Sequence, residues 1–509
     1  MVVIHSSSTT RRLLAATACL CMALPLAACG SGASPAPTST TTVAGETRLT
    51  GSVALFLPND GFTVSQDVPL NSWHDFADAT KDSLEDRGFE ADHVQTHADS
   101  DLERQSHRIQ DYVVDALDGS TDGSSADPEA QSTTLVVAPA APMTDTVKRY
   151  GDYVTQSLAQ GTGADEDATD ESLDESLSRM TRALGLAKKA GMHVVVVATP
   201  LPGFTPDAFV SLCSAREIGR LQARQLVSKL QLDSASRYNP KYIEILLPYD
   251  ADSDYPQLDE AFAREAFNGV WEVIGPYFRS GVVLSPSMRT TASTTVQDWR
   301  DVTIKATDAD SIEMEFRQRL GRPANGQGHV RIDGVIAMND YVANGVVKGL
   351  TALKYTGSAA DVNPSITIGD IVGNIAGRQD LQKNRVPDPK RAPSLSTPEE
   401  VRQENQKAQN RWPIVTGFGA YISAMPNIVN GKQWATGLVD RVASAADLAR
   451  ICAAFARGDS LDGLDFVSVQ DLYGQNVPTM SLPLLSVSAG NMKIELIDPG
   501  YITLAEAGL

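Results

Sequence analysis

The sequence predicts an α/β protein whose parallel sheets are covered by helices on both faces. Two observations predict it: short apolar runs rich in β-branched residues recur along the chain, and amphipathic segments separate them. The apolar runs lie at residues 52–57, 133–139, 192–200, 242–248, 281–286, 333–338 and 412–417. Because these runs are continuously apolar rather than alternating, we expect both faces of the strands to be buried.

The segments between the runs carry apolar side chains at helical spacing. Residues 72–87, with Trp73 near their start, predict the first helix. The segments 216–230 and 341–354 show the same pattern. Strands and helices therefore alternate along the chain, as they do in parallel sheets.

The composition is that of an ordinary globular protein, with 42% hydrophobic and 21% charged residues in 509. This length allows about two to four domains. The net charge is −20, and no basic stripe with interleaved aromatic residues is present. Binding to nucleic acid or to an anionic membrane surface is therefore not expected.

The N-terminus predicts export and lipidation. Arg11 and Arg12 precede an apolar stretch that is short for a membrane span and ends in "LAAC", followed by Gly30. This ending resembles the bacterial lipobox, so we expect residues 1–28 to be a signal peptide and Cys29 to carry the lipid anchor. An ordinary signal peptide is the alternative. Residues 29–50 are rich in Ser, Thr, Pro and Gly and predict a flexible tether on the extracytoplasmic face of the cell membrane.

Two cysteines, Cys213 and Cys452, then remain in the body, and whether they pair is open. Three segments interrupt the alternation of strands and helices: 117–132 is polar and glycine-rich, 160–177 is acidic, and 378–411 is densely charged. Each predicts a surface insertion or a mobile loop rather than core.

Several segments resemble, in order, the type 1 periplasmic binding proteins, especially the branch that serves sugar ABC transporters. They are "GFEADHVQTHADSDLERQSHRIQDYV" (88–113), "AKKAGMHVVVV" (187–197), "EIGRLQARQLVSKL" (217–230), "AFNGVWEVIGPYFRSGVV" (266–283), "IDGVIAMNDYVANGVVKGL" (332–350) and "VTGFGAYISAMPNIVNGKQWATGLVDR" (415–441). The resemblance implies two doubly wound parallel-sheet lobes joined by a hinge, with a ligand held between them. We expect an N-terminal lobe at 51–212, a C-terminal lobe at 213–437, and a hinge return at 438–509.

The function that the resemblance implies is capture of a sugar or a related small solute for an ABC importer, with permease subunits as partners. No cofactor or metal is expected, and catalysis is not expected because the common catalytic and phosphate-binding motifs are absent from the sequence. His93 and His97 are four residues apart, but we expect them to fall across a strand and a loop. The alternative is a surface-anchored sensor or interaction lipoprotein with the same fold and a degenerate or non-sugar pocket.

Asn339 and Asp340 follow an apolar run directly and are the first candidates for ligand contact. The resemblance implies that Asn339 hydrogen-bonds a sugar hydroxyl, since an amide supplies both a donor and an acceptor. The alternative is that one of the two residues simply caps the next helix.

The other candidates also come from the resemblance. Asn59 and Asp60 follow the first strand, and the rings of Trp73 and Trp299 are suited to the apolar faces of a sugar. For Trp73, a place in the core is the competing interpretation.

The loop "PYDADSDYP" (248–256) offers Asp250 and Asp254, with Asp252 between them. Alternating acids also suggest calcium, but the glycine and the final glutamate of an EF-hand loop are missing, which favours a solvated acidic loop.

The sequence departs from the family pattern at three places. Thr199-Pro200-Leu201, Gly419 and Val439 stand where charged or polar residues are common in the family. An unpaired polar group in a binding cleft is costly, so charged partners provide much of the discrimination among hydroxylated ligands. Their loss leaves the ligand class open.

Overall fold

The structure is a computed structural model that describes residues 48–61, 65–118, 133–156, 158, 169–321, 329–359 and 410–508. All of them belong to one compact unit, Thr47–Leu509. The expected signal peptide, Cys29 and almost all of the tether lie outside the described residues, as do most of the segments 117–132 and 378–411.

The N-terminal lobe is built on a seven-stranded sheet with the order β13-β14-β5-β4-β3-β1-β2. Only β13, which pairs antiparallel with β14, breaks the parallel arrangement. The strands are β1 (Val53–Pro58), β2 (Val94–Asp99), β3 (Thr134–Val137), β4 (His193–Val197), β5 (Ala208–Ser211), β13 (Val467–Leu472) and β14 (Gln475–Ser481).

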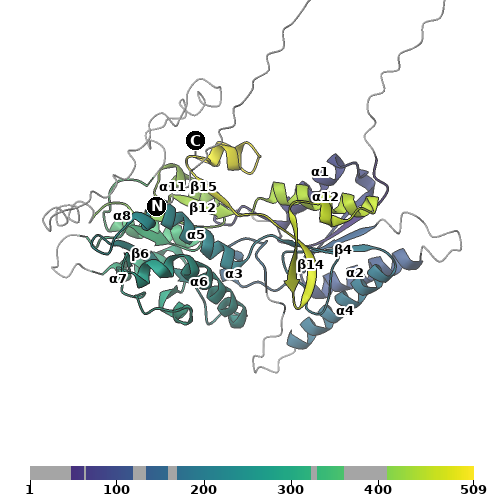
Figure 1. Cartoon of the computed structure of the whole chain (residues 1–509), viewed down its shortest axis with the longest axis horizontal. Coiled ribbons are helices and arrows are strands. Elements are labelled where there is room, and N and C mark those ends of the chain that lie inside the picture. Colours follow the sequence, from purple (N-terminus) through teal and green to yellow (C-terminus); the bar gives the residue numbers. More distant parts are fainter. Residues whose placement is uncertain are drawn as a thin grey trace, which may run out of the picture. The chain divides into compact units, whose positions relative to one another are not determined.

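Helices cover both faces of this sheet, with α1 and α12 on one face and α2 and α4 on the other (Figure 1). They are α1 (Trp73–Asp86), α2 (Leu102–Asp118), α4 (Thr169–Lys189) and α12 (Arg441–Arg457), and the short α3 (Asp145–Lys148) follows β3. Successive residues of β1 belong to different core clusters: Leu55 packs with one helix layer and Phe56 with the other. Burial of both faces explains why the strand is continuously apolar.

The C-terminal lobe repeats this design in a six-stranded sheet with the order β15-β12-β11-β10-β6-β8. Its strands are β6 (Lys241–Ile245), β8 (Val283–Leu284), β10 (Gly334–Ile336), β11 (Ile414–Thr416), β12 (Ala435–Leu438) and the antiparallel β15 (Leu485–Ser488). A separate two-stranded sheet pairs β7 (Leu247–Pro248) with β9 (Thr303–Ile304).

The helices of this lobe are α5 (Ala215–Lys229), α6 (Pro256–Arg279), α7 (Ala309–Leu320), α8 (Asp340–Ala352) and α11 (Met425–Val429). Short helical turns lie at Ala91–His93, Leu232–Ser234, Val296–Val302, Ile422–Ala424, Leu461–Gly463 and Lys493–Ile497. The chain passes between the two sheets three times: from β5 to α5, from β12 to α12, and from β14 to β15. The predicted α/β class with two doubly wound, largely parallel sheets is therefore confirmed.

One prediction is wrong. Residues 169–177 were expected in a surface insertion or loop but form the first part of α4. Leu177 is buried and Leu173 packs beside it against α2 and the sheet, so an apolar face continues through the acidic stretch. The many acidic residues of this stretch obscured the helical spacing of its apolar residues. Packing of that apolar face against α2 and the sheet stabilises the helix.

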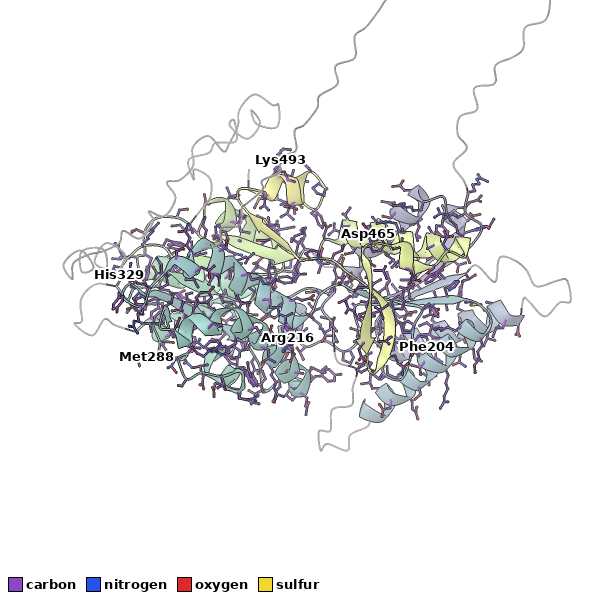
Figure 2. The ribbon with its side chains drawn as sticks, viewed as in Figure 1. Phe204, Arg216, Met288, His329, Asp465 and Lys493 are labelled. Atoms are coloured by element: carbon purple, nitrogen blue, oxygen red, sulfur yellow. The ribbon has the colours of Figure 1, made fainter. Side chains whose placement is uncertain are left out.

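Helices α5 and α6 touch backbone to backbone. A Cβ on Gly269 would lie 2.0 Å from the carbonyl oxygen of Arg216, and a Cβ on Gly219 would lie 2.1 Å from that of Ala266. Arg216, labelled in Figure 2, also pairs with Glu265 across the same contact at 3.2 Å. Only glycine permits this approach.

Gly269→Ala is expected to lower the free energy of unfolding by about 1–3 kcal/mol, because the added methyl group overpacks a rigid contact. Gly185→Ala is the matched control, since a Cβ on this α4 glycine would meet nothing within 4 Å. The control is expected to raise the free energy by about 0.5–1 kcal/mol through helix propensity. Urea unfolding measures both, and equal effects would contradict the packing argument.

Candidate functional site

Each sheet has a topological switch point, which lies at the carboxyl ends of its parallel strands. In the N-terminal lobe β1 lies between β2 and β3, and in the C-terminal lobe β6 lies between β8 and β10. Connections leave such a strand pair on opposite sides, and doubly wound sheets bind ligands at this point, here the ends of β1 and β3 and of β6 and β10. The residues that follow these strands are the candidates for ligand contact.

The first switch point brings together Asn59, Asp60 and Trp73. Oδ2 of Asp60 accepts hydrogen bonds from the backbone N–H groups of Trp73 at 2.5 Å and His74 at 3.4 Å, so it binds the N-terminus of α1. Oδ1 of Asn59 accepts from the N–H of Gly61 at 2.9 Å. Asn59 and Asp60 are exposed, whereas Trp73 is buried.

The second switch point holds Asn339 and Asp340, both fully buried. Asn339 caps α8, because its Oδ1 accepts from the N–H of Val342 at 2.9 Å. Its Nδ2 has no hydrogen-bond partner among the described residues. Capping therefore uses one end of the amide and leaves its donor for another partner.

Asp340 is held by three donors from the β11–β12 region. Its carboxylate accepts from the N–H of Tyr421 at 3.0 Å, from Nε2 of Gln433 at 2.7 Å and from Oγ1 of Thr436 at 2.8 Å. Burial raises its pKa to about 6, although these hydrogen bonds act in the opposite direction. Asp340 thus fixes the loop after β11 in place.

The loop after β7 carries the remaining candidates. Nζ of Lys305 lies 3.2 Å from a carboxylate oxygen of Asp250 and 2.8 Å from one of Asp252, so one lysine pairs with both acids. Asp254 is exposed. Trp299 is buried edge-on against Tyr249, with ring centroids 5.1 Å apart. Ligand contact by these residues stays a prediction, as it does for those at the two switch points.

Residues 144–153, for which the sequence analysis predicted no site, contact residues near both switch points. We call residues 144–153 the bridging segment; it includes α3 and follows β3 of the N-terminal lobe. Its Tyr153 packs on Trp73 with ring centroids 5.1 Å apart, and the Tyr153 hydroxyl donates to the carbonyl of Ser72 at 2.5 Å. These contacts tie the segment to α1.

The same segment contacts the C-terminal lobe at several points. The hydroxyl of Thr144 donates to Asp259 on α6, and the ring of Tyr150 lies 4.6 Å from that of Phe262. The guanidinium of Arg149 lies 3.9 Å above the ring of Tyr341.

The loop fixed by Asp340 also contacts the bridging segment. The hydroxyl of Tyr421 donates to the carbonyl of Arg149 at 2.8 Å. The segment therefore contacts the α8 and β11 ends of the C-terminal sheet, beside Asn339 and Asp340.

Two aromatic side chains of the bridging segment are buried: Tyr150, which contacts Phe262, and Tyr153, which contacts Trp73. A cavity of about 10 Å³ remains among the residues Pro69, Asn71, Tyr150, Gly151, Tyr153, Val154, Phe418, Gly419, Leu438 and Val439. That volume suits about one water molecule, whereas ligand sites measure roughly 300–1,000 Å³. The signal in the sequence was the pair Tyr150 and Tyr153 in an otherwise charged segment, "TDTVKRYGDY".

Four buried polar atoms in this region lack hydrogen-bond partners among the described residues. They are the Tyr150 hydroxyl, Oδ2 of Asp259, Oδ1 of Asn71 and Nδ2 of Asn339. Burial raises the pKa of both Tyr150 and Asp259, so both groups are disfavoured as anions. Unsatisfied buried groups of this kind are rare in folded proteins.

The residues at the three departures from the family pattern make contacts near the bridging segment. Oγ1 of Thr199 accepts from the N–H of Gln156 at 3.1 Å, and the carbonyl of Val439 accepts from Nδ2 of Asn71 at 2.9 Å. Gly419 has φ of +112°, and a Cβ there would lie 2.7 Å from the ring of Tyr421. These positions now pack against the bridging segment and its neighbours.

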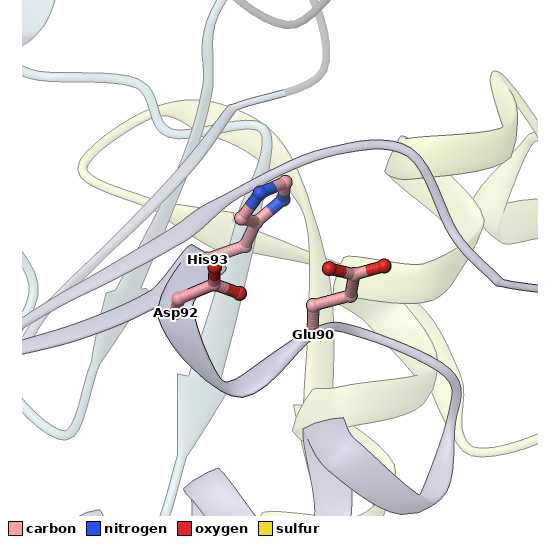
Figure 3. A group of neighbouring side chains, drawn as sticks. All are labelled: Glu90, Asp92 and His93. Carbon is pink, nitrogen blue, oxygen red and sulfur yellow. The ribbon is translucent and has the colours of Figure 1, made fainter.

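A separate group of possible metal ligands lies before β2. Glu90, Asp92 and His93 place one ligand atom each within 4.8 Å of one another (Figure 3). None is buried, and Oε1 of Glu90 is already paired with Arg48 at 2.8 Å. We assign no site to this cluster.

Comparisons with known proteins find similarity to solved structures alone. No protein-family model and no curated protein matches its sequence. A solute-binding protein from Clostridium phytofermentans with bound β-D-glucose has 18% identity and a TM-score of 0.48, covering 90% of this chain and 100% of its own. One from Chloroflexus aurantiacus with D-glucose has 15% identity and a TM-score of 0.45, covering 90% and 98%.

A periplasmic ribose ABC transporter protein from Conexibacter woesei has 12% identity and a TM-score of 0.44, covering 88% of this chain and 95% of its own. These structures come from the family that the sequence resembles. The fold class follows from the strand order of the chain itself.

Proposed function

We propose that this protein captures a small hydroxylated solute between its two lobes and delivers it to the permease of an ABC importer. The observation that carries the proposal is the set of unpartnered buried polar atoms beside the two switch points, above all Nδ2 of Asn339. Amide and phenol groups pair well with hydroxyl groups, which both donate and accept. Binding rather than catalysis is proposed.

A lipid anchor on Cys29 would hold the protein on the extracytoplasmic face of the membrane. The lipobox-like "LAAC" and the Ser/Thr/Pro-rich residues that follow it support this part of the proposal. Among the described residues no helix is long and apolar enough to cross a membrane. Mass spectrometry of the membrane fraction tests it: an acylated N-terminal Cys29 is expected, and a mature chain that begins elsewhere would reject it.

A surface-anchored sensor or interaction protein is the second candidate. The small cavity beside Tyr150 and Tyr153 and the uncharged residues Thr199, Gly419 and Val439 favour it. In this case the protein would keep the two-lobed fold without transporting a sugar.

A thermal-shift screen separates the two candidates. The protein would be residues 29–509 with Cys29 replaced by serine, tested against pentoses, hexoses, oligosaccharides, nucleosides and polyols. A ligand that binds only the native state raises the unfolding midpoint by mass action. A concentration-dependent rise with one of these classes supports capture of a solute, and no rise across the panel favours the second candidate.

Asn339→Ser is expected to weaken binding of the ligand found in that screen by more than about 1 kcal/mol, roughly fivefold or more. Serine retains an oxygen that can cap α8 but removes the unpartnered Nδ2 donor. Asn344→Ser, on the same helix and hydrogen-bonded to Asn427 and Ser423, is the control and should bind normally. Calorimetric titration measures both, and unchanged affinity in Asn339→Ser would make this residue a cap alone.

A further inference from the structure

Arg149 of the bridging segment contacts three separate parts of the C-terminal lobe. Its guanidinium donates to the carbonyl of Ala306 and, at 3.3 Å, to that of Thr307, both between β9 and α7. The same group lies 3.9 Å above the ring of Tyr341, in the first turn of α8. The backbone carbonyl of Arg149 accepts from the hydroxyl of Tyr421, after β11, at 2.8 Å. Its charged group and its backbone are therefore both bound to the other lobe.

The contact matches the chemistry of a guanidinium. This planar group donates from a fixed fork and stacks on aromatic rings, which a lysine ammonium does less well. Hydrogen bonds from a charged donor are also stronger than those from a neutral one. The ring of Tyr341 is itself held, because its hydroxyl donates to the carbonyl of Thr307 at 3.3 Å.

The bridging segment is also bound firmly to its own lobe. Tyr153 packs on Trp73 of α1, and its hydroxyl donates to the carbonyl of Ser72 at 2.5 Å. Just beyond the segment, the N–H of Thr155 donates to the carbonyl of Cys213, after β5, at 2.8 Å. Separation of the two lobes would therefore have to break the contacts of Arg149.

We propose that Arg149 is an interlobe latch, which holds the two lobes together when no ligand is bound. The latch consists of the Arg149 guanidinium with Ala306, Thr307 and Tyr341. A contact that already favours the joined state reduces the free energy that a ligand must supply to close the lobes. The inference goes beyond the proposed function, because it concerns the protein without ligand.

Two backbone hydrogen bonds outside the bridging segment can report separation of the lobes. The N–H of Leu70, between β1 and α1, donates to the carbonyl of Gly419 at 2.8 Å. The N–H of Ser423, after β11, donates to the carbonyl of Gln66 at 3.1 Å. Neither bond involves Arg149, so faster hydrogen exchange at these two amides measures opening between the lobes rather than fraying of the segment.

Arg149→Met tests the latch, since methionine keeps an unbranched apolar stem but removes the charge and the donors. Exchange would be followed by mass spectrometry on residues 29–509 with Cys29 replaced by serine, without ligand. The rates at Leu70 and Ser423 are expected to rise about tenfold or more, because a hydrogen bond from a charged donor changes an equilibrium by at least this factor. The amide of Val136, in the buried strand β3, reports global unfolding and should change much less.

Lys148→Met is the matched control. Lys148 is the neighbouring cation, its side chain is 59% exposed, and it pairs with Asp145 on its own helix at 3.5 Å. Its replacement should leave both reporter rates unchanged. Tyr341→Leu removes the ring from the opposite lobe and should accelerate exchange in the same direction, which keeps the test available if Arg149→Met does not fold.

Unchanged rates at Leu70 and Ser423 in Arg149→Met would overturn the proposal, as would an equal acceleration at Val136 or the same acceleration in Lys148→Met. A ligand found in the thermal-shift screen together with unchanged exchange would overturn the latch and leave solute capture standing. Faster exchange in Arg149→Met without any such ligand would support the latch and count against capture. The two proposals can therefore fail separately.

Discussion

Asp340→Ala is expected to lower the free energy of unfolding by about 3–5 kcal/mol. The substitution removes a carboxylate that accepts from three buried donors, on Tyr421, Gln433 and Thr436, and each donor left unsatisfied costs about 1–3 kcal/mol. Urea unfolding at pH 7 measures the loss. A loss below about 1 kcal/mol would mean that the loop after β11 does not depend on this carboxylate.

The pH dependence of Asp340→Asn provides the control for this prediction. The pKa of Asp340 is raised from 3.8 to about 6, so its protonated form favours the folded state, and this contribution is present below about pH 4 and lost as the pH rises through 6. An asparagine does not titrate. The stability difference between the two proteins should therefore change between pH 4 and pH 7, by up to roughly 3 kcal/mol, and a constant difference would contradict the raised pKa.

Arg319→Met is expected to lower the free energy of unfolding by a similar amount, about 3–5 kcal/mol, because it breaks a buried ion pair. The guanidinium of Arg319 on α7 lies 3.4 Å from the carboxylate of Glu244 on β6, and both side chains are 1% exposed. It also donates to the carbonyls of Ile245 at 2.9 Å and Thr303 at 2.6 Å. Methionine would leave a buried carboxylate without its cation and these carbonyls without their donor.

Two further variants test the cause. Arg317→Met removes a guanidinium two residues earlier that pairs with Glu313 at the surface, and its effect should stay below about 0.5 kcal/mol. In the double variant Arg319→Met with Glu244→Met the isolated charge is gone, so part of the stability should return. A double variant as unstable as the sum of two single variants would show that packing, not the uncompensated charge, causes the loss.

Most of the fold could be predicted because each of its main strands lies in a short, continuously apolar run of the sequence. Runs such as 133–139 and 192–200 are continuously apolar, and the structure places β3 and β4 inside them. Both observed strands are shorter than the runs, and β4 ends where Ala198 adopts a φ of 62°. Such an end is set by the tertiary environment, and the composition of the run does not mark it.

The candidate site was predicted only in part. The position of Asn339 after an apolar strand was enough to place it at a carboxyl edge, and its capping role was one of two interpretations. The contacts of Tyr150 with Phe262 and of Tyr421 with Arg149 join residues more than one hundred positions apart. No local pattern specifies which distant surface an exposed-looking segment will meet.

The sequence by itself determined the alternation of strands and helices, because apolar period and β-branched composition act over a few residues. It also placed amide and carboxyl groups at the strand ends, where a doubly wound sheet exposes them. Only the tertiary structure decided that Tyr150 packs on Phe262 and Tyr153 on Trp73, and that three donors hold Asp340. The physical reason is that burial and hydrogen bonding between distant residues depend on which segments pack together, which is a property of the whole folded chain.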